Sequence, residues 1–146
     1  MEKNQVAGKR LLLVEDDRAF REMLKTALSI DAYSVVEANN GAEALGLFRN
    51  GGFDLVMLDL EMPFLKGDEL ARGIKKLAPR QPILMVTGHD TRPSLQNPVD
   101  ALLRKPVVLT QLREVMASLL AGTETRVAAV EVRAKADRGV CGPEPE

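Results

Sequence analysis

The sequence predicts an α/β fold, a doubly wound parallel sheet of five strands with helices on both faces. Three observations lead to this prediction. Short apolar runs alternate along the chain with segments whose apolar residues recur at helical spacing. The runs are apolar at successive positions, which is typical of strands buried on both faces. Acidic, hydroxyl and basic residues stand where the runs end, and this is where parallel sheets place functional side chains.

Each expected strand has its own signal. The first is a Leu-Leu-Leu-Val run that stops at three acids. The second, Tyr-Ser-Val-Val-Glu-Ala, is rich in β-branched residues and precedes an Asn-Asn-Gly turn. The third is an apolar run that stops at a carboxylate, Asp59. The expected strands are residues 11–14, 33–38, 55–58, 82–86 and 101–104.

Helices are expected between the strands, because apolar residues recur there every three or four positions. Asp17 is a suitable N-cap for the first helix, a Gly-Gly pair ends the second, and a proline follows the third. Residues 91–97 are poor helix material because prolines bracket them, so only one or two distorted turns are expected there. The apolar positions are 20, 24, 27 and 28 in the first helix, 45 and 48 in the second, 70, 74 and 77 in the third, and 109, 112, 116 and 119 in the last.

Strands that alternate with helices at this pitch imply right-handed crossovers and parallel pairing. Five strands and five helical segments predict a flavodoxin-like fold with strand order 2-1-3-4-5. In that order the winding reverses between strands 1 and 3, where the carboxyl ends of the strands border a ligand crevice. Glu15, Asp16 and Asp59 are therefore expected to be neighbours.

The residues at the strand ends suit phosphoryl chemistry. Three carboxylates brought together repel one another unless a cation neutralises them. Mg²⁺ is the natural cation, because it binds oxygen ligands and accepts a phosphate oxygen. Lys105 and the Thr87 hydroxyl would contact other phosphoryl oxygens. Asp59 follows the central strand and is the best placed nucleophile for in-line transfer to an aspartyl phosphate.

Five motifs stand in register along residues 10–120 of the chain. They are V-E-D-D at 14–17, N-G-A-E-A-L at 40–45, D-L-V-M-L-D-L-E-M-P-F-L-K-G at 54–67, T-G at 87–88 and K-P at 105–106. Together they closely resemble the receiver (response-regulator) domains of two-component signalling. The resemblance implies that Asp59 is the phosphoacceptor and that Glu15 and Asp16 are the acidic pair at the Mg²⁺ site. It also implies that the backbone carbonyl of Glu61 is a further metal ligand.

The same resemblance assigns Thr87 to the switch hydroxyl and Lys105 to the invariant lysine, which is followed by a proline whose peptide bond is usually cis. Family members take phosphate from a histidine kinase or a phosphotransfer protein. They then change the face formed by the fourth helical segment, the fifth strand and the last helix, which acts on a downstream protein target. The chain is thus expected to be a regulatory phosphoacceptor, whose own catalysis extends only to gaining and losing the phosphoryl group.

Two departures fall on the face that signals in the family. Leu102 stands three residues before Lys105, where the family usually has Tyr or Phe, and it has no hydroxyl to move. Lys105 follows Thr87 by 18 residues, a few fewer than usual, and the interval contains Pro93 and Pro98. The helical segment there is expected to be reduced or partly unwound. We therefore expect a domain that accepts phosphate normally and reports it differently or passes it on.

The composition bounds the rest of the interpretation. The 146 residues suit one domain, expected at residues 8–122, with a C-terminal tail at 123–146. The 20 Lys and Arg nearly balance the 21 Asp and Glu, and no basic cluster suggests direct nucleic-acid binding. One cysteine cannot form an internal disulfide, and no apolar run approaches the length of a membrane span. A cytoplasmic protein without membrane association is expected.

Three alternatives stay open from the sequence. The tail is either a helical extension that docks on a partner or on a second copy in a homodimer, or an unpacked linker. The domain is either phosphorylated or a degenerate receiver that binds partners without phosphate. A phosphatase of the haloacid-dehalogenase type is less favoured. That family has a second Asp two residues after the nucleophile, where this chain has Glu61, and the chain lacks room for a cap domain.

Overall fold

A computed structural model describes residues 8–62, 65–88 and 99–121 of the chain. Five parallel strands form one sheet in the order β2-β1-β3-β4-β5. This is the order predicted from the alternation of strands and helices. The strands are β1 (Arg10–Val14), β2 (Ser34–Ala38), β3 (Leu55–Asp59), β4 (Ile83–Thr87) and β5 (Ala101–Arg104).

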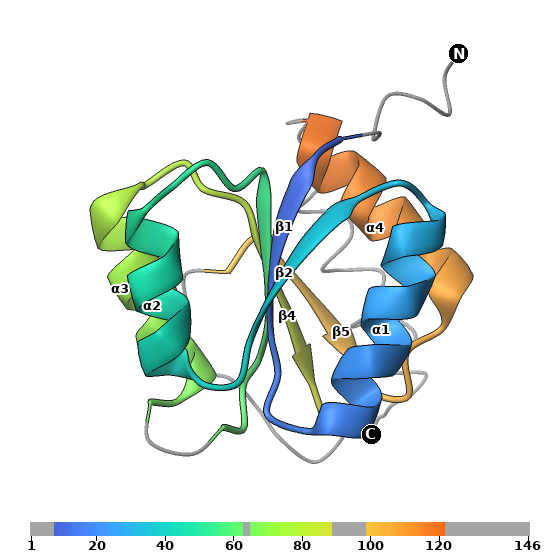
Figure 1. Cartoon of the computed structure of the whole chain (residues 1–146), viewed down its shortest axis with the longest axis horizontal. Coiled ribbons are helices and arrows are strands. Elements are labelled where there is room, and N and C mark those ends of the chain that lie inside the picture. Colours follow the sequence, from blue (N-terminus) through green and yellow to red (C-terminus); the bar gives the residue numbers. More distant parts are fainter. Residues whose placement is uncertain (1–7, 63–64, 89–98, 122–146) are drawn as a thin grey trace, which may run out of the picture.

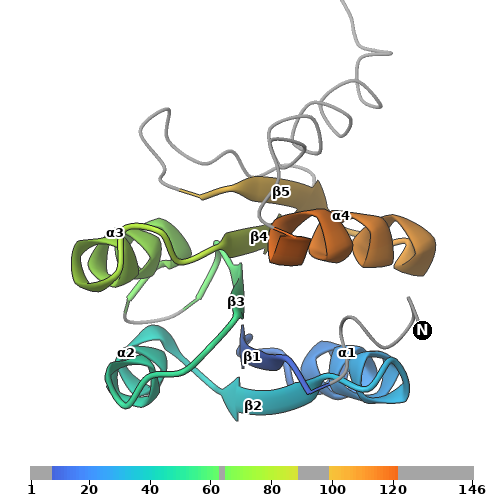
Figure 2. The same cartoon turned by 90° about the horizontal axis from the view of Figure 1, so that it is seen from above.

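Helices cover both faces of the sheet. Seen from above, α1 and α4 lie against one face and α2 and α3 against the other (Figure 2). The described residues contain α1 (Arg18–Ile30), α2 (Gly41–Arg49), α3 (Gly67–Leu77) and α4 (Leu109–Ala121). The fifth helical segment, expected as distorted turns at residues 91–97, lies outside the described residues. The predicted flavodoxin-like architecture is confirmed.

The element boundaries agree with the sequence predictions to within a residue or two. Asp17 caps α1 as expected, because its side chain accepts a hydrogen bond from the Phe20 amide. The prediction placed the end of the third strand before Asp59, but β3 includes this residue. A carboxylate is tolerated there because the residue is the last of the strand and lies at the edge where the acidic loops converge.

The side chains of successive strand residues point to opposite faces of the sheet, and this alternation divides the interior into two cores. In β1, Leu11 and Leu13 belong to the core beneath α1 and α4, whereas Leu12 and Val14 belong to the core beneath α2 and α3. We call these the α1–α4 core and the α2–α3 core. All four side chains are essentially inaccessible to solvent, which explains the continuous apolar run.

The same alternation sorts the polar residues at the strand ends. In β3, Leu55 and Met57 face the α1–α4 core, so Asp59 falls on that side. In β4 the residues of the α1–α4 core are Leu84 and Val86, so Thr87 falls on the opposite side. The sequence thus places the nucleophile candidate and the hydroxyl candidate on different faces of one sheet edge.

All strands run from the upper to the lower edge of the sheet as drawn in Figure 1, so their carboxyl ends gather at the lower edge. Among the described residues, no helix has the length and apolar character required to cross a membrane.

Candidate functional site

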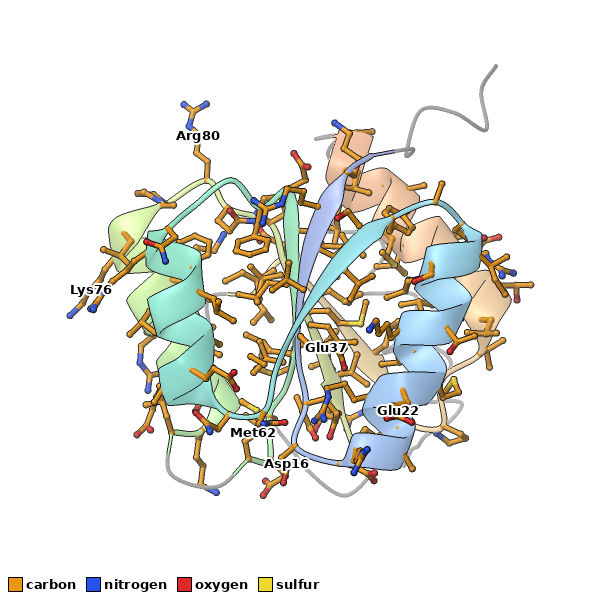
Figure 3. All side chains as sticks on the ribbon, in the orientation of Figure 1. Asp16, Glu22, Glu37, Met62, Lys76 and Arg80 are labelled. Atoms are coloured by element: carbon orange, nitrogen blue, oxygen red, sulfur yellow. The ribbon has the colours of Figure 1, made fainter. Side chains whose placement is uncertain are left out.

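Three carboxylates meet at the carboxyl edge of the sheet. Val14 pairs with Leu58 in the β1–β3 ladder, so the residues that follow on each strand, Glu15 and Asp59, are brought side by side. Glu15, Asp16 and Asp59 each offer one oxygen, and these oxygens lie within 4.8 Å of one another. Figure 3 shows Asp16 at the lower edge of the molecule, the end at which the strands finish. The predicted cluster is therefore formed.

Lys105 reaches into this cluster from the end of β5. Its Nζ lies 3.3 Å from Asp59 Oδ2 and 3.6 Å from Glu15 Oε1. Its backbone amide donates to the Thr87 carbonyl at 2.7 Å, which ties the residue to the end of the neighbouring strand β4. The Lys105–Pro106 peptide bond is cis, as the family resemblance predicted.

Burial makes the acidic cluster electrostatically strained. Glu15 is 2% exposed and Asp59 is 4% exposed. Burial, followed by the negative charge of Asp59, raises the pKa of Glu15 from 4.5 to about 7. Burial alone would lower the pKa of Lys105, but the charges of Glu15 and Asp59 outweigh it and raise that pKa. One ammonium group thus faces two buried carboxylates, so an additional cation could be accommodated beside them.

The loop after β3 holds the Asp59 side chain in place. Its Oδ1 accepts a hydrogen bond from the Glu61 amide at 3.2 Å. Gly67 closes the loop, and its amide donates to the Leu60 carbonyl at 3.0 Å. A Cβ at Gly67 would lie 2.7 Å from Leu60 Cα and closer still to the Asp59 carbonyl oxygen. Only glycine therefore lets α3 start so near the strand that carries Asp59.

Thr87 ends β4 with its side chain fully buried. Within the described part of the chain, its Oγ1 is the one buried side-chain nitrogen or oxygen atom that has no hydrogen-bond partner. A buried hydroxyl without a partner is unfavourable and marks a place where a ligand oxygen could be accommodated. Leu102 is half-buried and packs against the α2–α3 core, the face to which Thr87 also belongs.

Two further residues support the site and had no signal in the sequence. Arg21 donates from Nη1 to the Glu15 carbonyl at 2.7 Å and from Nε to Glu37 Oε1 at 3.1 Å, so it links the acidic loop to β2. The Phe20 ring lies under the Lys105 ammonium, with Nζ 4.4 Å from the ring centroid. The helical spacing predicted only that Phe20 packs in the core. Its contact with Lys105 was not predictable, because Lys105 follows β5 and meets Phe20 only in the folded chain.

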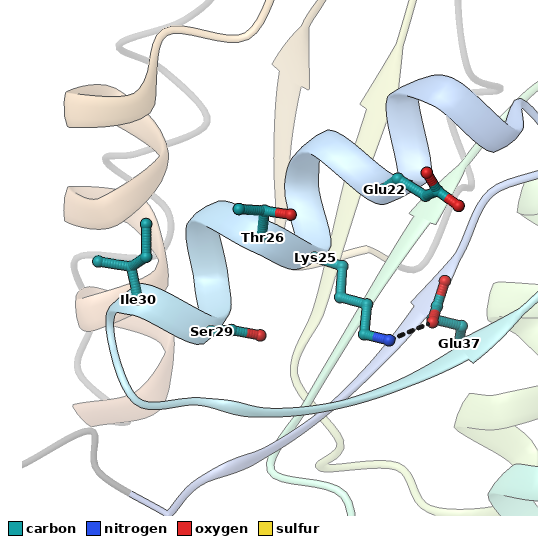
Figure 4. A pocket seen from close by; sticks show the side chains of 6 residues that line it. All are labelled: Glu22, Lys25, Thr26, Ser29, Ile30 and Glu37. Carbon is teal, nitrogen blue, oxygen red and sulfur yellow. Dashed lines mark ion pairs between the residues drawn. The ribbon is translucent and has the colours of Figure 1, made fainter.

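A groove of about 510 Å³ opens elsewhere, between α1 and the edge strand β2 (Figure 4). Its charged walls are already paired, since Lys25 Nζ lies 2.8 Å from Glu37 Oε2 and Arg21 contacts the other oxygen of Glu37. These two cations, Lys25 first, keep the pKa of Glu37 below its ordinary value. The groove does not include the carboxylate cluster, and we place the functional site at the strand ends.

A parallel sheet of this order, with clustered carboxylates, a lysine and a buried hydroxyl at its carboxyl edge, defines a regulatory phosphoacceptor domain of the α/β class. The chain belongs to the response regulator receiver domain family, whose profile matches residues 11–117. This confirms the resemblance noted from the five motifs and decides against the phosphatase alternative.

The relatives of the chain support this assignment. Response regulator MprA from Mycobacterium sp. (strain KMS) is 41% identical over 118 residues, which cover 78% of this chain and 51% of MprA. The chain thus spans about half the length of the curated relatives it matches. TrrA, a response regulator protein from Thermotoga maritima solved in complex with Mg²⁺-BeF, is 36% identical with a TM-score of 0.72, covering 76% of this chain and 98% of TrrA.

TrrA has also been solved in complex with the histidine kinase ThkA, with a TM-score of 0.71 to this chain, 36% identity, and coverage of 77% of this chain and 98% of TrrA. A CheY-like receiver domain protein from Methanospirillum hungatei JF-1 is 32% identical with a TM-score of 0.73, covering 80% of this chain and 96% of that protein.

Proposed function

We propose that the chain accepts a phosphoryl group on Asp59 and signals the change through protein–protein contacts. One observation carries this proposal: a buried carboxylate at the end of the central strand lies 3.3 Å from a lysine ammonium and within a cluster of three acids. A nucleophile, a positive charge and oxygen ligands for a cation are the parts that phosphoryl transfer needs.

Mg²⁺ fits the donor set of this cluster. We assign the carboxylates of Glu15, Asp16 and Asp59 and the backbone carbonyl of Glu61 as its protein ligands. All four donors are hard oxygens. Burial, and after it the charge of Asp59, raises the pKa of Glu15, and a divalent cation would favour the charged form of this carboxylate. When bound, the ion would neutralise charge on the phosphoryl oxygens. The solved complex of TrrA with Mg²⁺-BeF supports this choice of cation.

The side chains of this protein supply the other parts of the reaction. An Asp59 oxygen attacks phosphorus in line, forming an O–P bond while the P–N bond of a phosphohistidine donor breaks, and the electron pair leaves with the imidazole nitrogen. Lys105 holds one phosphoryl oxygen by charge. Thr87 ends the neighbouring strand with its side chain on the other face of the sheet, so its hydroxyl would have to turn toward the strand end to donate to another phosphoryl oxygen. The phosphoryl group would then supply the acceptor that this buried hydroxyl lacks among the described residues.

A histidine kinase or a histidine phosphotransfer protein is the proposed donor, and the complex of TrrA with ThkA supports it. Because such donors obtain their phosphate from ATP, we place the protein in the cytoplasm. The downstream step is contact with a protein target. Leu102 packs against the α2–α3 core and has no hydroxyl to move, so we infer that the response to phosphate uses other groups.

A Mg²⁺-dependent phosphoryl label tests the proposal. The chain is incubated with acetyl phosphate and Mg²⁺, and its mass is measured intact and after proteolysis. We expect one phosphoryl group on Asp59 and none on Asp59→Asn or in the presence of EDTA. A label on the Asn variant, or no label on the wild type, would contradict the proposal. If binding to protein partners persists unchanged in that case, the chain is the degenerate interaction module.

The donor is then identified by phosphotransfer from candidate histidine kinases, with Asp59→Asn again as the control. The cognate donor is expected to label the wild-type chain much faster than the other kinases do, and not to label the variant at all. Equal and slow labelling by every kinase would contradict a dedicated kinase partner.

A further inference from the structure

Phe20 presents its ring to the ammonium that the proposed reaction depends on. Lys105 Nζ lies 4.4 Å from the ring centroid, within the range of a cation–π contact. The same ammonium also lies 3.3 Å from Asp59 Oδ2 and 3.6 Å from Glu15 Oε1. Lys105 thus contacts two acids and an aromatic face.

The position of the ring is fixed by the same loop that carries the acids. The Phe20 amide donates to the Asp17 side chain at 3.2 Å, which anchors the first turn of α1 directly after Glu15 and Asp16. The ring is half-buried and packs against the α1–α4 core, the face to which Asp59 also belongs. Phe20 therefore cannot follow Lys105 outward without leaving the core.

The two kinds of contact respond differently to a bound cation. The Asp59 and Glu15 carboxylates that attract Lys105 are also proposed metal ligands, so a bound ion would compete with Lys105 for their negative charge. The ring carries no charge and no ligand atom for Mg²⁺, so its attraction for the ammonium is not shared with the ion. The contact between the ring and the ammonium would therefore persist when the carboxylates bind the ion.

We propose that Phe20 is a positioning residue for phosphoryl transfer: its ring keeps the Lys105 ammonium directed at Asp59 while the acids are occupied. This inference rests on the proposed function and adds to it a residue outside the five motifs. A long lysine side chain has many rotamers, and holding it in place before reaction avoids an entropic cost in the transition state.

Substitution of the ring tests the proposal. Phe20→Leu keeps an apolar side chain against the core and removes the aromatic face, whereas Phe20→Tyr keeps the face. With acetyl phosphate and Mg²⁺, we expect the leucine variant to be labelled at Asp59 about two- to fivefold more slowly than wild type. The tyrosine variant should be labelled at close to the wild-type rate. In a Lys105→Gln background, Phe20→Leu should slow labelling no further.

Phe53 provides a matched control. Its ring also contacts a cation, since Arg10 Cζ lies 4.6 Å from the ring centroid. Phe53 belongs to the α2–α3 core, however, and lies at the opposite end of the strands from Asp59. Phe53→Leu should be labelled at the wild-type rate, after thermal unfolding has shown that each variant is folded. Equal slowing by Phe53→Leu and Phe20→Leu would overturn the positioning role, because general loosening would then explain both.

A second readout needs neither metal nor phosphate. In the metal-free wild-type chain, the ring should shift the NMR resonances of the Lys105 methylene group next to Nζ upfield, and the shift should disappear in Phe20→Leu and remain in Phe20→Tyr. If Phe20→Leu changed neither the NMR shift nor the labelling rate, this inference would be overturned while the proposed function would stand. Absence of any Asp59 label on the wild-type chain would instead overturn the proposed function, and this inference with it.

Discussion

The charge of Glu15 depends strongly on its surroundings. Its pKa rises from 4.5 to about 7 on folding, so between these values the folded chain holds a proton that the unfolded chain has lost. The resulting stability is fully present below pH 4.5 and is lost as the pH rises through about 7. Protons also compete with Mg²⁺ for this ligand, so metal affinity should increase over the same interval.

Glu15→Gln removes this titration and should flatten the pH profile. In the metal-free wild type, we expect the free energy of unfolding to fall by on the order of 3 kcal/mol from Glu15 alone between pH 4.5 and pH 8. Urea unfolding in EDTA at several pH values, on wild type and variant, measures the difference. Mg²⁺ at pH 8 should restore stability to the wild type and not to the variant. Parallel profiles for both proteins would contradict the assignment.

The buried Thr87 hydroxyl should lower the stability of the protein while serving its proposed function. Its hydroxyl is buried without a partner among the described residues, and valine has nearly the same shape. Thr87→Val should therefore leave the metal-free protein as stable as wild type or more stable, by about 1 kcal/mol, because an unsatisfied polar group is removed. The same variant should bind beryllofluoride with Mg²⁺ more weakly.

Thr87→Ser is the control for this prediction, since it keeps the hydroxyl and loses a methyl group. It should bind beryllofluoride nearly as well as wild type and be less stable, as measured by NMR titration and thermal unfolding. If valine instead destabilised the chain and serine did not, the hydroxyl would have a structural partner, and its proposed role at the phosphoryl group would be wrong.

At the scale of the elements, the strands were predictable because their signal is local. Apolar runs specified β1, β3 and β4, and parallel topology alone brought Glu15 and Asp59 together. The inclusion of Asp59 in β3 was missed, since a terminal carboxylate reads as a loop residue. The contacts of Arg21 and Phe20 were not predictable, because their partners belong to other elements and meet them only in the folded chain.

The start of α3 controls the geometry of the Asp59 loop. Gly67→Ala would place a Cβ 2.7 Å from Leu60 Cα, so the loop or the helix has to move. We expect a loss of about 1–3 kcal/mol in unfolding free energy and weaker Mg²⁺ binding.

Gly73 lies in the middle of the same helix and serves as the control. The atom nearest to an added Cβ there is Leu45 Cδ1 at 3.8 Å, an ordinary contact. Gly73→Ala should therefore leave Mg²⁺ binding unchanged and raise stability by about 0.5–1 kcal/mol through helix propensity. Thermal unfolding and Mg²⁺ titration of both variants measure these effects. Similar losses at both positions would show that the tight approach at Gly67 is not what matters.

At the scale of the molecule, the described residues that form the two cores lie between Leu11 and Leu120. The division into one domain at residues 8–122 and a tail at 123–146 stays a prediction. A chain that ends at residue 122 should unfold at the same midpoint as the full chain and acquire the Asp59 label at the same rate. A lower midpoint would contradict this.

The tail has a further test in solution. If it joins two copies, the full-length chain should show a concentration-dependent mass in sedimentation equilibrium, and the shortened chain should not. Identical monomer masses for both would exclude the homodimer interpretation of the tail.

The alternation of side chains along β3 also determines which aspartate lies beside Lys105. Asp54 stands just before the strand and Asp59 at its end, and Asp54 accepts a hydrogen bond from the Arg10 amide at the opposite edge. A deletion of one residue within β3 would leave the local sequence around Asp59 almost unchanged, yet it would turn the carboxylate away from Lys105. Asp59 and Asp54 carry the same chemical group, and their positions along the strand and on its faces decide which of them lies beside Lys105.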